Sequence, residues 1–262
     1  MYHYQTTIAY KGTHYFGWQD LGAIEQKPTI QACIHKALKK ICDYQECTVS
    51  GASRTDAGVH AQGQIAKLTL PIEINAEKLQ LGMNSLLPED IRVQQCTACH
   101  KEFNPNQHSL SKEYHYYFST GSITNPALCD IISHIPLNHR PCNNKTLDIS
   151  AMKLACHHFV GEHDFYSFAT RDSSIASTIR SISHCEILNA DFSDFNGETY
   201  CLKIIGNGFL KHMVRYISGA LFELGRGNIN INQITEALEK PQKDKLSPKS
   251  KAKGLHLIRI NF

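Results

Sequence analysis

Arg54 and Asp56 are the residues of this 262-residue chain whose types and spacing point most directly to chemistry. They lie in the stretch Gly51–Ala61, between segments rich in β-branched and apolar residues, so we expect them at a strand end or on a loop between strands. A single carboxylate held beside a cation in such a loop can act as a nucleophile. The same two residues could instead form an ordinary surface ion pair.

The run from Arg54 to Ala61 resembles the signature G-R-T-D-A-G-V-H-A of the tRNA pseudouridine synthase A family, with Ser53 where a glycine is usual. Further short motifs similar to those of that family occur along nearly the whole chain. They are Tyr10–Gln19, Asn84–Ile91, Lys112–Tyr116, Gly161–Phe165, Arg180–Ile182 and Gly208–Arg215. The chain departs from the family pattern at Lys11, at Phe103–His108 and at Ser247–Lys249, which bears on RNA contacts more than on chemistry.

The resemblance implies a cofactor-free conversion of uridine to pseudouridine in the anticodon stem-loop of tRNA, at positions 38 to 40. Asp56 would be the nucleophile, and the guanidinium groups of Arg54 and Arg215 would keep it ionised. Addition to ribose C1′, addition to uracil C6 and removal of the C2′ proton stay open as its route. Tyr114 would stack on the detached base and assist proton transfer, although a tyrosine with its ordinary pKa of about 10 is a weak base.

RNA binding would use local clusters of basic residues, because a net charge of +3 is a weak argument for a polyanionic partner. A paired uridine must be flipped out of its stem, and we expect Arg54 to fill the vacated space or to hold the phosphate, because its guanidinium can both stack and hydrogen-bond. Candidate phosphate contacts are Lys211, His212, Lys249 and Lys251. The segment Pro241–Lys253 is expected either to sweep over bound RNA or to be a mobile surface loop.

A non-catalytic RNA-binding or RNA-folding protein on the same scaffold is the alternative from another functional class. Both hypotheses predict tRNA binding, and only the enzyme changes a base in the product. The complete motif from Arg54 to Ala61 argues against a protein that has lost its catalytic residues. The family resemblance also implies an intimate homodimer.

The ten cysteines would suggest disulfides in a small secreted protein, yet no charged and apolar leader precedes Tyr4 and no segment reaches transmembrane length. We therefore expect a cytoplasmic protein with reduced thiols and no membrane partner. Cys96–His100 matches the C-x-x-C-H haem-attachment pattern, but attachment requires export. His157–His163 misses the H-x-x-E-H metal pattern by one residue. We expect neither a metal nor a cofactor.

Hydrophobic periodicity predicts an α/β (α+β) protein with two halves of similar content, 1–108 carrying the Asp56 loop and 109–262. Helices are expected near 30–41, 76–86, 148–159, 210–224 and 231–238, and strands near 4–10, 48–50, 65–70, 91–95, 114–119, 178–188, 199–205 and 255–262. The family resemblance adds that both halves are ferredoxin-like, that helices flank one continuous, mainly antiparallel sheet, and that the active cleft lies between the halves.

Overall fold

The chain folds into two compact units, each containing a sheet and helices. The structure, a computed structural model, describes residues 1–20, 22, 28–120, 125–135, 147–170, 172, 175–192 and 198–262. Unit 1 consists of Met1–Leu110 together with His256–Phe262, and unit 2 consists of Ser111–Leu255. The division into 1–108 and 109–262 stays a prediction, and by contacts the closing residues group with the N-terminal unit.

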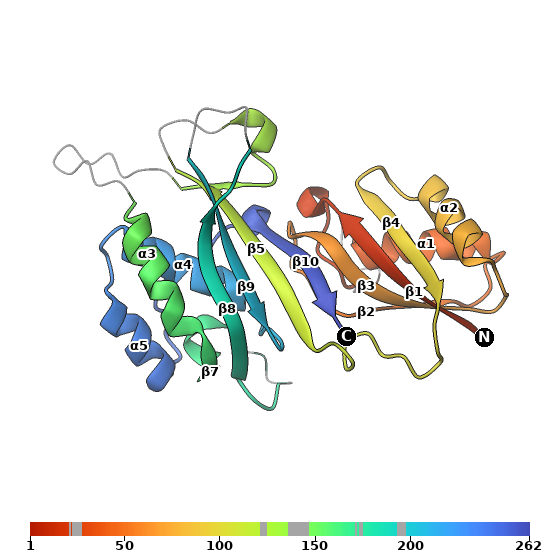
Figure 1. The fold of residues 1–262 in the computed structure, drawn as a ribbon. Coiled ribbons are helices and arrows are strands. Elements are labelled where there is room, and N and C mark those ends of the chain that lie inside the picture. Colours follow the sequence, from red (N-terminus) through yellow and green to blue (C-terminus); the bar gives the residue numbers. More distant parts are fainter. Residues whose placement is uncertain are drawn as a thin grey trace. The chain divides into compact units, whose positions relative to one another are not determined.

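Unit 1 has the βαββαβ order of a ferredoxin-like half. Its elements are β1 (Tyr2–Tyr10), α1 (Ile30–Ile41), β2 (Thr48–Gly51), β3 (His60–Leu70), α2 (Ala76–Leu86) and β4 (Ile91–Ala98). β1 pairs antiparallel with β3 on one side and β4 on the other, and β2 pairs antiparallel with the second half of β3. α1 and α2 lie side by side (Figure 1). The mixed fold class and the antiparallel pairing are confirmed for this unit.

The two helices of unit 1 begin at the residues that cap them. The side chain of Thr29 accepts a hydrogen bond from the backbone N–H of Ala32, and that of Asn75 accepts from the N–H groups of Glu77 and Lys78. On β1, alternate residues from Tyr4 to Tyr10 are buried, as the period of a strand with one covered face requires. These local signals are the reason the predicted bounds of α1 and α2 are correct.

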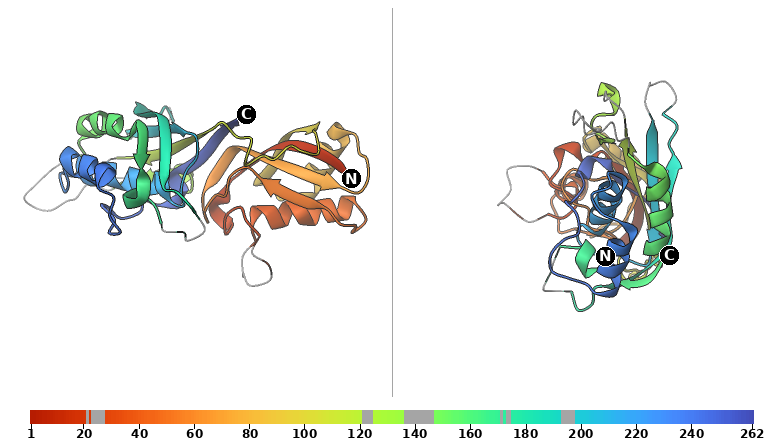
Figure 2. Two further views of the ribbon diagram at one scale, coloured as in Figure 1. Left: turned by 90° about the horizontal axis from the view of Figure 1, so that it is seen from below. Right: turned by 90° about the vertical axis from the view of Figure 1, so that its left-hand side faces the viewer.

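β3 begins five residues earlier than the predicted strand at Ile65, because it gains partners on both edges. Its first residues pair with the end of β1 and, in parallel, with β10 (Leu255–Asn261), through His256 opposite His60 and Leu257 opposite Ala61. Tertiary pairing thus extends the strand over glutamine and glycine residues of low strand propensity. Figure 2 marks the two ends of the chain, near which β1 and β10 lie in sequence. By contacts, β1 and the residues of β10 from His256 onward belong to unit 1.

Unit 2 is built around an antiparallel sheet in the order β5-β9-β8-β7, with the short β6 alongside β5. Its elements are β5 (Ser111–Ser119), β6 (Ser133–His134), α3 (Ile149–Cys156), β7 (Gly161–Asp164), β8 (Ile179–Asn189), β9 (Thr199–Gly206), α4 (Met213–Gly225) and α5 (Ile231–Glu239). α3 contacts both α4 and β8, and α5 contacts β7. α3 and α4 cover the core of unit 2. Its fully buried side chains include Phe118, Phe159 and Ile217.

Two helices of unit 2 are shorter than predicted. α3 ends at Cys156, and His157–Phe159 form a 3₁₀ helix before β7 begins at Gly161, whose φ is +118°. α4 begins at Met213 instead of near Leu210, because His212 has a left-handed backbone with φ of 65°. A non-glycine residue in that conformation cannot continue a right-handed helix. Leu210–His212 are therefore loop, and the helix starts directly before Arg215.

Within the described ranges, no helix is both long enough and apolar enough to cross a membrane. Every cysteine in those ranges has a free thiol, and no three His, Cys, Asp or Glu side chains gather there as a metal ion would require. Burial raises the pKa of Cys96 to about 11 and raises the pKa of Cys99 as well. Both thiols of the C-x-x-C-H pattern are therefore held in the protonated form, which is a poor metal ligand.

Candidate functional site

Asp56 lies on the loop between β2 and β3, and the base of this loop is fixed by a buried glutamine. The backbone N–H of Ala52 donates to the carbonyl of Ile65 at 2.8 Å. The Gln64 side chain, which is fully buried, accepts from the N–H of Ser53 at 3.2 Å and donates to the Ser53 carbonyl at 2.6 Å. The amide thereby acts as a strand partner for Ser53 and sets the direction in which the loop leaves the sheet.

The segment Tyr10–Trp18 holds the tip of the loop from the other side. The N–H of Trp18 donates to the Thr55 carbonyl at 3.0 Å, and the N–H of Gly58 donates to the Tyr15 carbonyl at 3.2 Å. The hydroxyls of Tyr10 and Thr55 share a hydrogen bond of 2.7 Å. The role of the motif Tyr10–Gln19 is therefore to hold the loop of Asp56 in place. The sequence pattern alone did not show this role.

Gly17 is required by this packing. Its φ is +86°, and a Cβ at this position would collide with the carbonyl oxygen of Thr55 and lie 3.0 Å from the carbonyl carbon of Asp56. Gly58 also has a positive φ, +78°, and the N–H of Val59 donates to the Asp56 carbonyl to close the turn. Only glycine enters this region freely, so the backbone on both flanks of Asp56 has little freedom.

Asp56 itself is half-buried on this fixed loop, between the buried Thr55 and the exposed Ala57. Arg54 is exposed, and in the described ranges its guanidinium makes no ion pair or hydrogen bond. The pairing of Arg54 with Asp56 expected from the sequence is thus not seen in this structure. An exposed arginine beside a fixed carboxylate is instead placed to reach a ligand.

Tyr114 and Arg215 both lie in unit 2. Tyr114 is on β5 with 6% of its surface exposed, and its ring meets Phe209 edge-on with centroids 5.1 Å apart. Arg215 is in the first turn of α4 with 9% exposed, and its Nε donates to the carbonyl of Ser250 at 2.9 Å. Their convergence with Asp56 of unit 1 on one site stays a prediction.

Part of the segment Pro241–Lys253 packs against α4, which differs from the mobile surface loop that was one of its two expected forms; passage over bound RNA stays a prediction. The Ser250 N–H donates to the Arg215 carbonyl, and the Ser247 hydroxyl donates to the Tyr216 carbonyl at 3.2 Å. A Cβ on Gly219 of α4 would collide with the Pro248 carbonyl, so the two backbones are in direct contact. Sequence composition missed this because the anchoring is through backbone carbonyls and a small helix residue.

Two of the four predicted phosphate contacts, His212 and Lys249, lie in contact, and Lys211 directly precedes His212 in the chain. Lys211 is exposed on the loop before α4, and Nζ of Lys249 lies 3.4 Å from Nε2 of His212. The His212 ring also shares a 2.6 Å hydrogen bond with the Thr170 hydroxyl. Lys251 is exposed two residues after Lys249, and its carbonyl accepts from the Tyr116 hydroxyl. The left-handed turn at His212 therefore brings basic side chains from two segments together.

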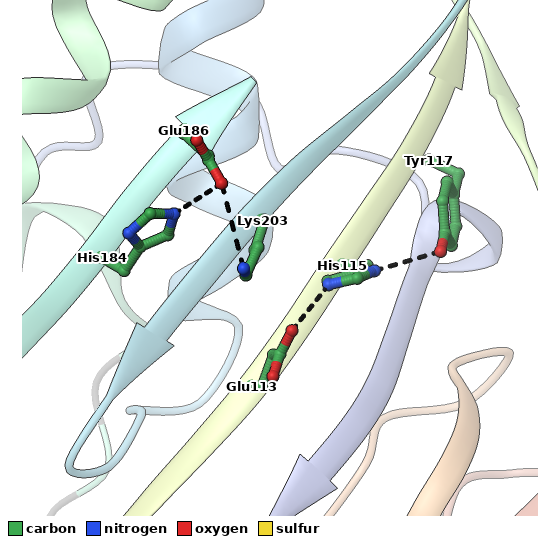
Figure 3. A network of polar contacts seen from close by, with 6 residues as sticks. All are labelled: Glu113, His115, Tyr117, His184, Glu186 and Lys203. Atoms are coloured by element: carbon green, nitrogen blue, oxygen red, sulfur yellow. Dashed lines mark hydrogen bonds and ion pairs between the residues drawn. The ribbon is translucent and has the colours of Figure 1, made fainter. Parts of the chain in front are cut away.

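Strand alternation on β5 separates two sets of polar residues. Lys112, with 8% exposed, and Tyr114 share the face that packs on the core. On the other face His115 bonds both Glu113 and Tyr117 at 3.0 Å. A neighbouring network joins Glu186 to His184 at 2.7 Å and to Lys203 at 3.9 Å, as Figure 3 shows. The carboxylates of Glu113 and Glu186 are thus engaged away from the Tyr114 face.

Lys112 is a further candidate that the sequence pattern did not single out by itself. Burial, and to a smaller extent the positive charge of Arg180, together lower the pKa of Lys112 to about 8. Burial also lowers the pKa of the Arg180 guanidinium. The motif Lys112–Tyr116 could have pointed to Lys112, because residues i and i+2 of a strand share a face and Tyr114 was already a candidate.

Comparison with known proteins places this geometry in a family. A family model described as tRNA pseudouridine synthase matches residues 7–105 and 155–262, more than half of the chain. The chain is 51% identical over 263 aligned residues to tRNA pseudouridine synthase A 2 of Desulfotalea psychrophila, covering 99% of this chain and 98% of the relative. It is 33% identical, over the full length of both chains, to tRNA pseudouridine synthase A 2 of Bacillus cereus and to tRNA pseudouridine synthase A of Listeria welshimeri.

Among solved structures, a crystal structure described as an unknown protein from Galdieria sulphuraria matches with 10% identity and a TM-score of 0.19. It covers 87% of this chain and 93% of its own. A likeness at that score carries no conclusion about either fold or function.

Proposed function

This chain belongs to the tRNA pseudouridine synthase family, and from that premise we propose that it isomerises uridine in the anticodon stem-loop of tRNA with Asp56 as nucleophile. It is an isomerase that acts on tRNA. The observation that carries the finer proposal is the loop of Asp56. Its backbone is fixed by Tyr15, Gly17 and Trp18, while Asp56 as a residue is half-buried.

The reaction is balanced without any added reagent. The bond between uracil N1 and ribose C1′ breaks, and a bond between uracil C5 and the same C1′ forms. One proton leaves C5 and one is gained at N1, so substrate and product have the same mass and oxidation state. This balance supports the expectation that no cofactor takes part.

The proposed catalytic roles follow from charge and position. Asp56 acts in its ionised form on the sugar or the base, and a fixed backbone lowers the cost of orienting it. Arg215, held in the first turn of α4 by the Ser250 carbonyl, supplies the positive charge that favours the ionised carboxylate. Tyr114 presents an aromatic ring to the detached uracil and assists removal of the C5 proton.

The proposed RNA contacts lie on the exposed basic residues. Arg54, unpaired with other described residues, enters the space left by the flipped uridine or holds its phosphate. Lys211, His212, Lys249 and Lys251 contact the phosphate backbone. Recognition through backbone charge and shape suits a stem-loop of variable sequence. The family resemblance further supports a homodimer in the cytoplasm.

Substitution of the carboxylate tests the assignment. Asp56→Asn removes the negative charge and leaves the size of the side chain unchanged, so we expect pseudouridine formation to fall by at least about 10⁴-fold while tRNA binding persists. The measurement is tritium release from C5-labelled uridine in an anticodon stem-loop substrate. Asp43→Asn is the matched control, because Asp43 is exposed in unit 1 with φ of 48°, a conformation that asparagine accepts.

Full activity in the Asp56→Asn variant would remove Asp56 from the mechanism. A wild-type protein that binds tRNA and releases no tritium would instead favour the non-catalytic RNA-binding alternative. Mapping of pseudouridine in the product decides whether the modified base lies in the anticodon stem-loop or elsewhere in the tRNA.

A further inference from the structure

Lys112 and Arg180 lie on the same face of the unit 2 sheet, on either side of a glycine. In the strand register, Lys112 of β5 is opposite Gly206 of β9, and Gly206 is opposite Ile182 of β8. Arg180 precedes Ile182 by two residues on β8, so its side chain leaves the sheet on the same side. Because Gly206 has no side chain, the sheet surface between the two basic residues is not filled by β9.

Phe209 occupies the space above Gly206. A Cβ on Gly206 would lie 3.2 Å from Cζ of Phe209, and the Phe209 ring meets the ring of Tyr114 at 81°. Phe209 is half-exposed, in contrast to the buried Tyr114. The face therefore presents an aromatic ring that is accessible to a ligand, in contact with the proposed base-stacking tyrosine and next to two cations.

The guanidinium of Arg180 is held in one orientation by its own strand. Its Nη1 donates to the carbonyl of Ser177 at 2.9 Å and to that of Ile179 at 2.6 Å. In the described ranges no hydrogen bond or ion pair engages its Nε or Nη2. Those two nitrogens form one edge of the planar group, and that edge matches two oxygens of a phosphate in bidentate fashion.

The glycine loop after β9 passes close to the Nε side of Arg180. Nε and Cδ of Arg180 lie 3.6 and 3.7 Å from the position that a Cβ on Gly208 would take. Any side chain there would stand against the Nε side of the guanidinium, and glycine leaves it open. The nearby charge of Lys112 also makes this place favourable for an anion, because each cation lies in the unfavourable field of the other.

The same loop leads from Arg180 to the basic cluster before α4. Gly208 is three residues from Lys211 and four from His212, whose ring faces Lys249. One loop thus runs from the side of Arg180 to the basic cluster, and it carries the half-exposed ring of Phe209. Positive points separated by an aromatic surface are the arrangement that single-stranded nucleic acid binds, through phosphates and stacked bases.

We propose that Arg180 binds a phosphodiester group of the substrate RNA through its Nε–H and Nη2–H edge, next to Phe209 and Tyr114. The proposal deepens the proposed function, on which it rests for the identity of the ligand. It assigns a phosphate-binding residue on β8, separate from the lysines before and after α4.

Salt dependence of binding tests the proposal. Arg180→Gln should raise the Kd for tRNA about tenfold and reduce the slope of log Kd against log salt concentration by roughly 0.7 to 0.9, as loss of one phosphate contact does. Lys153→Gln is the matched control, since Lys153 is an exposed cation on α3 of the same unit. It should leave both Kd and slope near the wild-type values. A wild-type slope in Arg180→Gln overturns the proposal.

A second variant covers the case in which Arg180→Gln does not fold, since its Nη1 supports two carbonyls. Arg180→Lys keeps the charge and loses the two-point geometry, so the slope should stay and Kd should rise several-fold. An unaltered Kd in this variant contradicts bidentate binding. The proposed function fails separately, if tRNA binding shows these changes and wild-type protein forms no pseudouridine. Pseudouridine formation with an unchanged slope in Arg180→Gln overturns the Arg180 contact alone.

Discussion

Lys112 is a buried cation with a second cation, Arg180, close enough to lower its pKa. Its ammonium group is buried on the core-facing side of β5, and both burial and the charge of Arg180 disfavour the protonated form, with a pKa of about 8. A buried cation with a like charge nearby destabilises the folded state relative to an apolar residue of similar size. Groups kept in such surroundings are often functional, and Lys112 shares its strand face with Tyr114.

Replacement of Lys112 by methionine should stabilise the protein at neutral pH by on the order of 1 to 3 kcal/mol. The folded pKa is about 8 and the ordinary value is 10.5, so between these values the unfolded chain binds more protons and wild-type stability rises with pH. The advantage of Lys112→Met should therefore shrink as the pH approaches 10.5. The measurement is the unfolding midpoint of both proteins across that range.

Lys36→Met serves as the comparison for this experiment, because Lys36 is exposed on α1. It should change the midpoint little, because an exposed side chain contributes little to burial. An advantage of Lys112→Met that is constant from neutral pH to pH 10.5 would show that the lysine is not titrating in this range in the folded protein.

For single residues, the sequence shows which side chains are candidates for the site but not what those side chains contact. Asp56, Tyr114 and Arg215 could be selected because each lies in a short motif of a recognised family pattern. The bonds of Gln64 to Ser53, and the open edge of Arg180, depend on which segments meet in three dimensions. No local pattern records such meetings, so those roles could only be found in the structure.

At the scale of elements, the loop of Asp56 is shaped by a segment some forty residues earlier in the chain. The carbonyl of Thr55 accepts from Trp18, and the side chain of Trp18 lies against Gly51, where any Cβ would meet the indole ring. Gly12 makes an equally close approach to the backbone of Val59. The segment Tyr10–Gln19 and the loop of Asp56 thus pack together and hold each other's backbone in place.

Gly17→Ala should disturb this element more than an equivalent change elsewhere. We expect a loss of about 2 to 4 kcal/mol of stability, from the positive φ and the collision with the Thr55 carbonyl, and a fall of about 10²-fold in kcat as Asp56 is displaced. Gly22→Ala is the control, since Gly22 has φ of +80° and no described atom lies within 4 Å of a Cβ there.

The control should lose only about 1 kcal/mol, which is the penalty of the backbone conformation alone. Thermal unfolding and single-turnover kinetics measure the two effects. Equal losses of stability and of kcat in the two variants would mean that the loop moves aside at no cost. The segment Tyr10–Gln19 would then not position Asp56.

Element bounds were predictable where caps and periodicity agree, as for α1 and α2. They were wrong where the backbone conformation of one residue decides the boundary. His212 gives no sequence sign of its left-handed φ, so the start of α4 was placed three residues early. The first half of β3 lacks strand propensity and exists because β1 and β10 pair with it.

At the scale of the molecule, the βαββαβ order of unit 1 could be predicted from periodicity and family resemblance together. The membership of β10 could not, since a closing strand of high propensity can pair with any open edge. The structure pairs it in parallel with β3 and stacks the ring of His256 on that of His60, with centroids 4.5 Å apart. The last strand therefore supports the sheet edge from which the Asp56 loop leaves.

Leu257→Ala should accordingly weaken unit 1, although the residue is near the C-terminus. Leu257 is fully buried, so loss of its side chain should cost about 2 to 5 kcal/mol. Trp18 is the only tryptophan of the chain and is buried in unit 1, and its fluorescence reports unfolding there. Leu238→Ala, in the buried face of α5 in unit 2, is the matched control and should shift the Trp18 midpoint less. An unchanged Trp18 midpoint in Leu257→Ala would show that β10 does not stabilise the unit that carries Asp56.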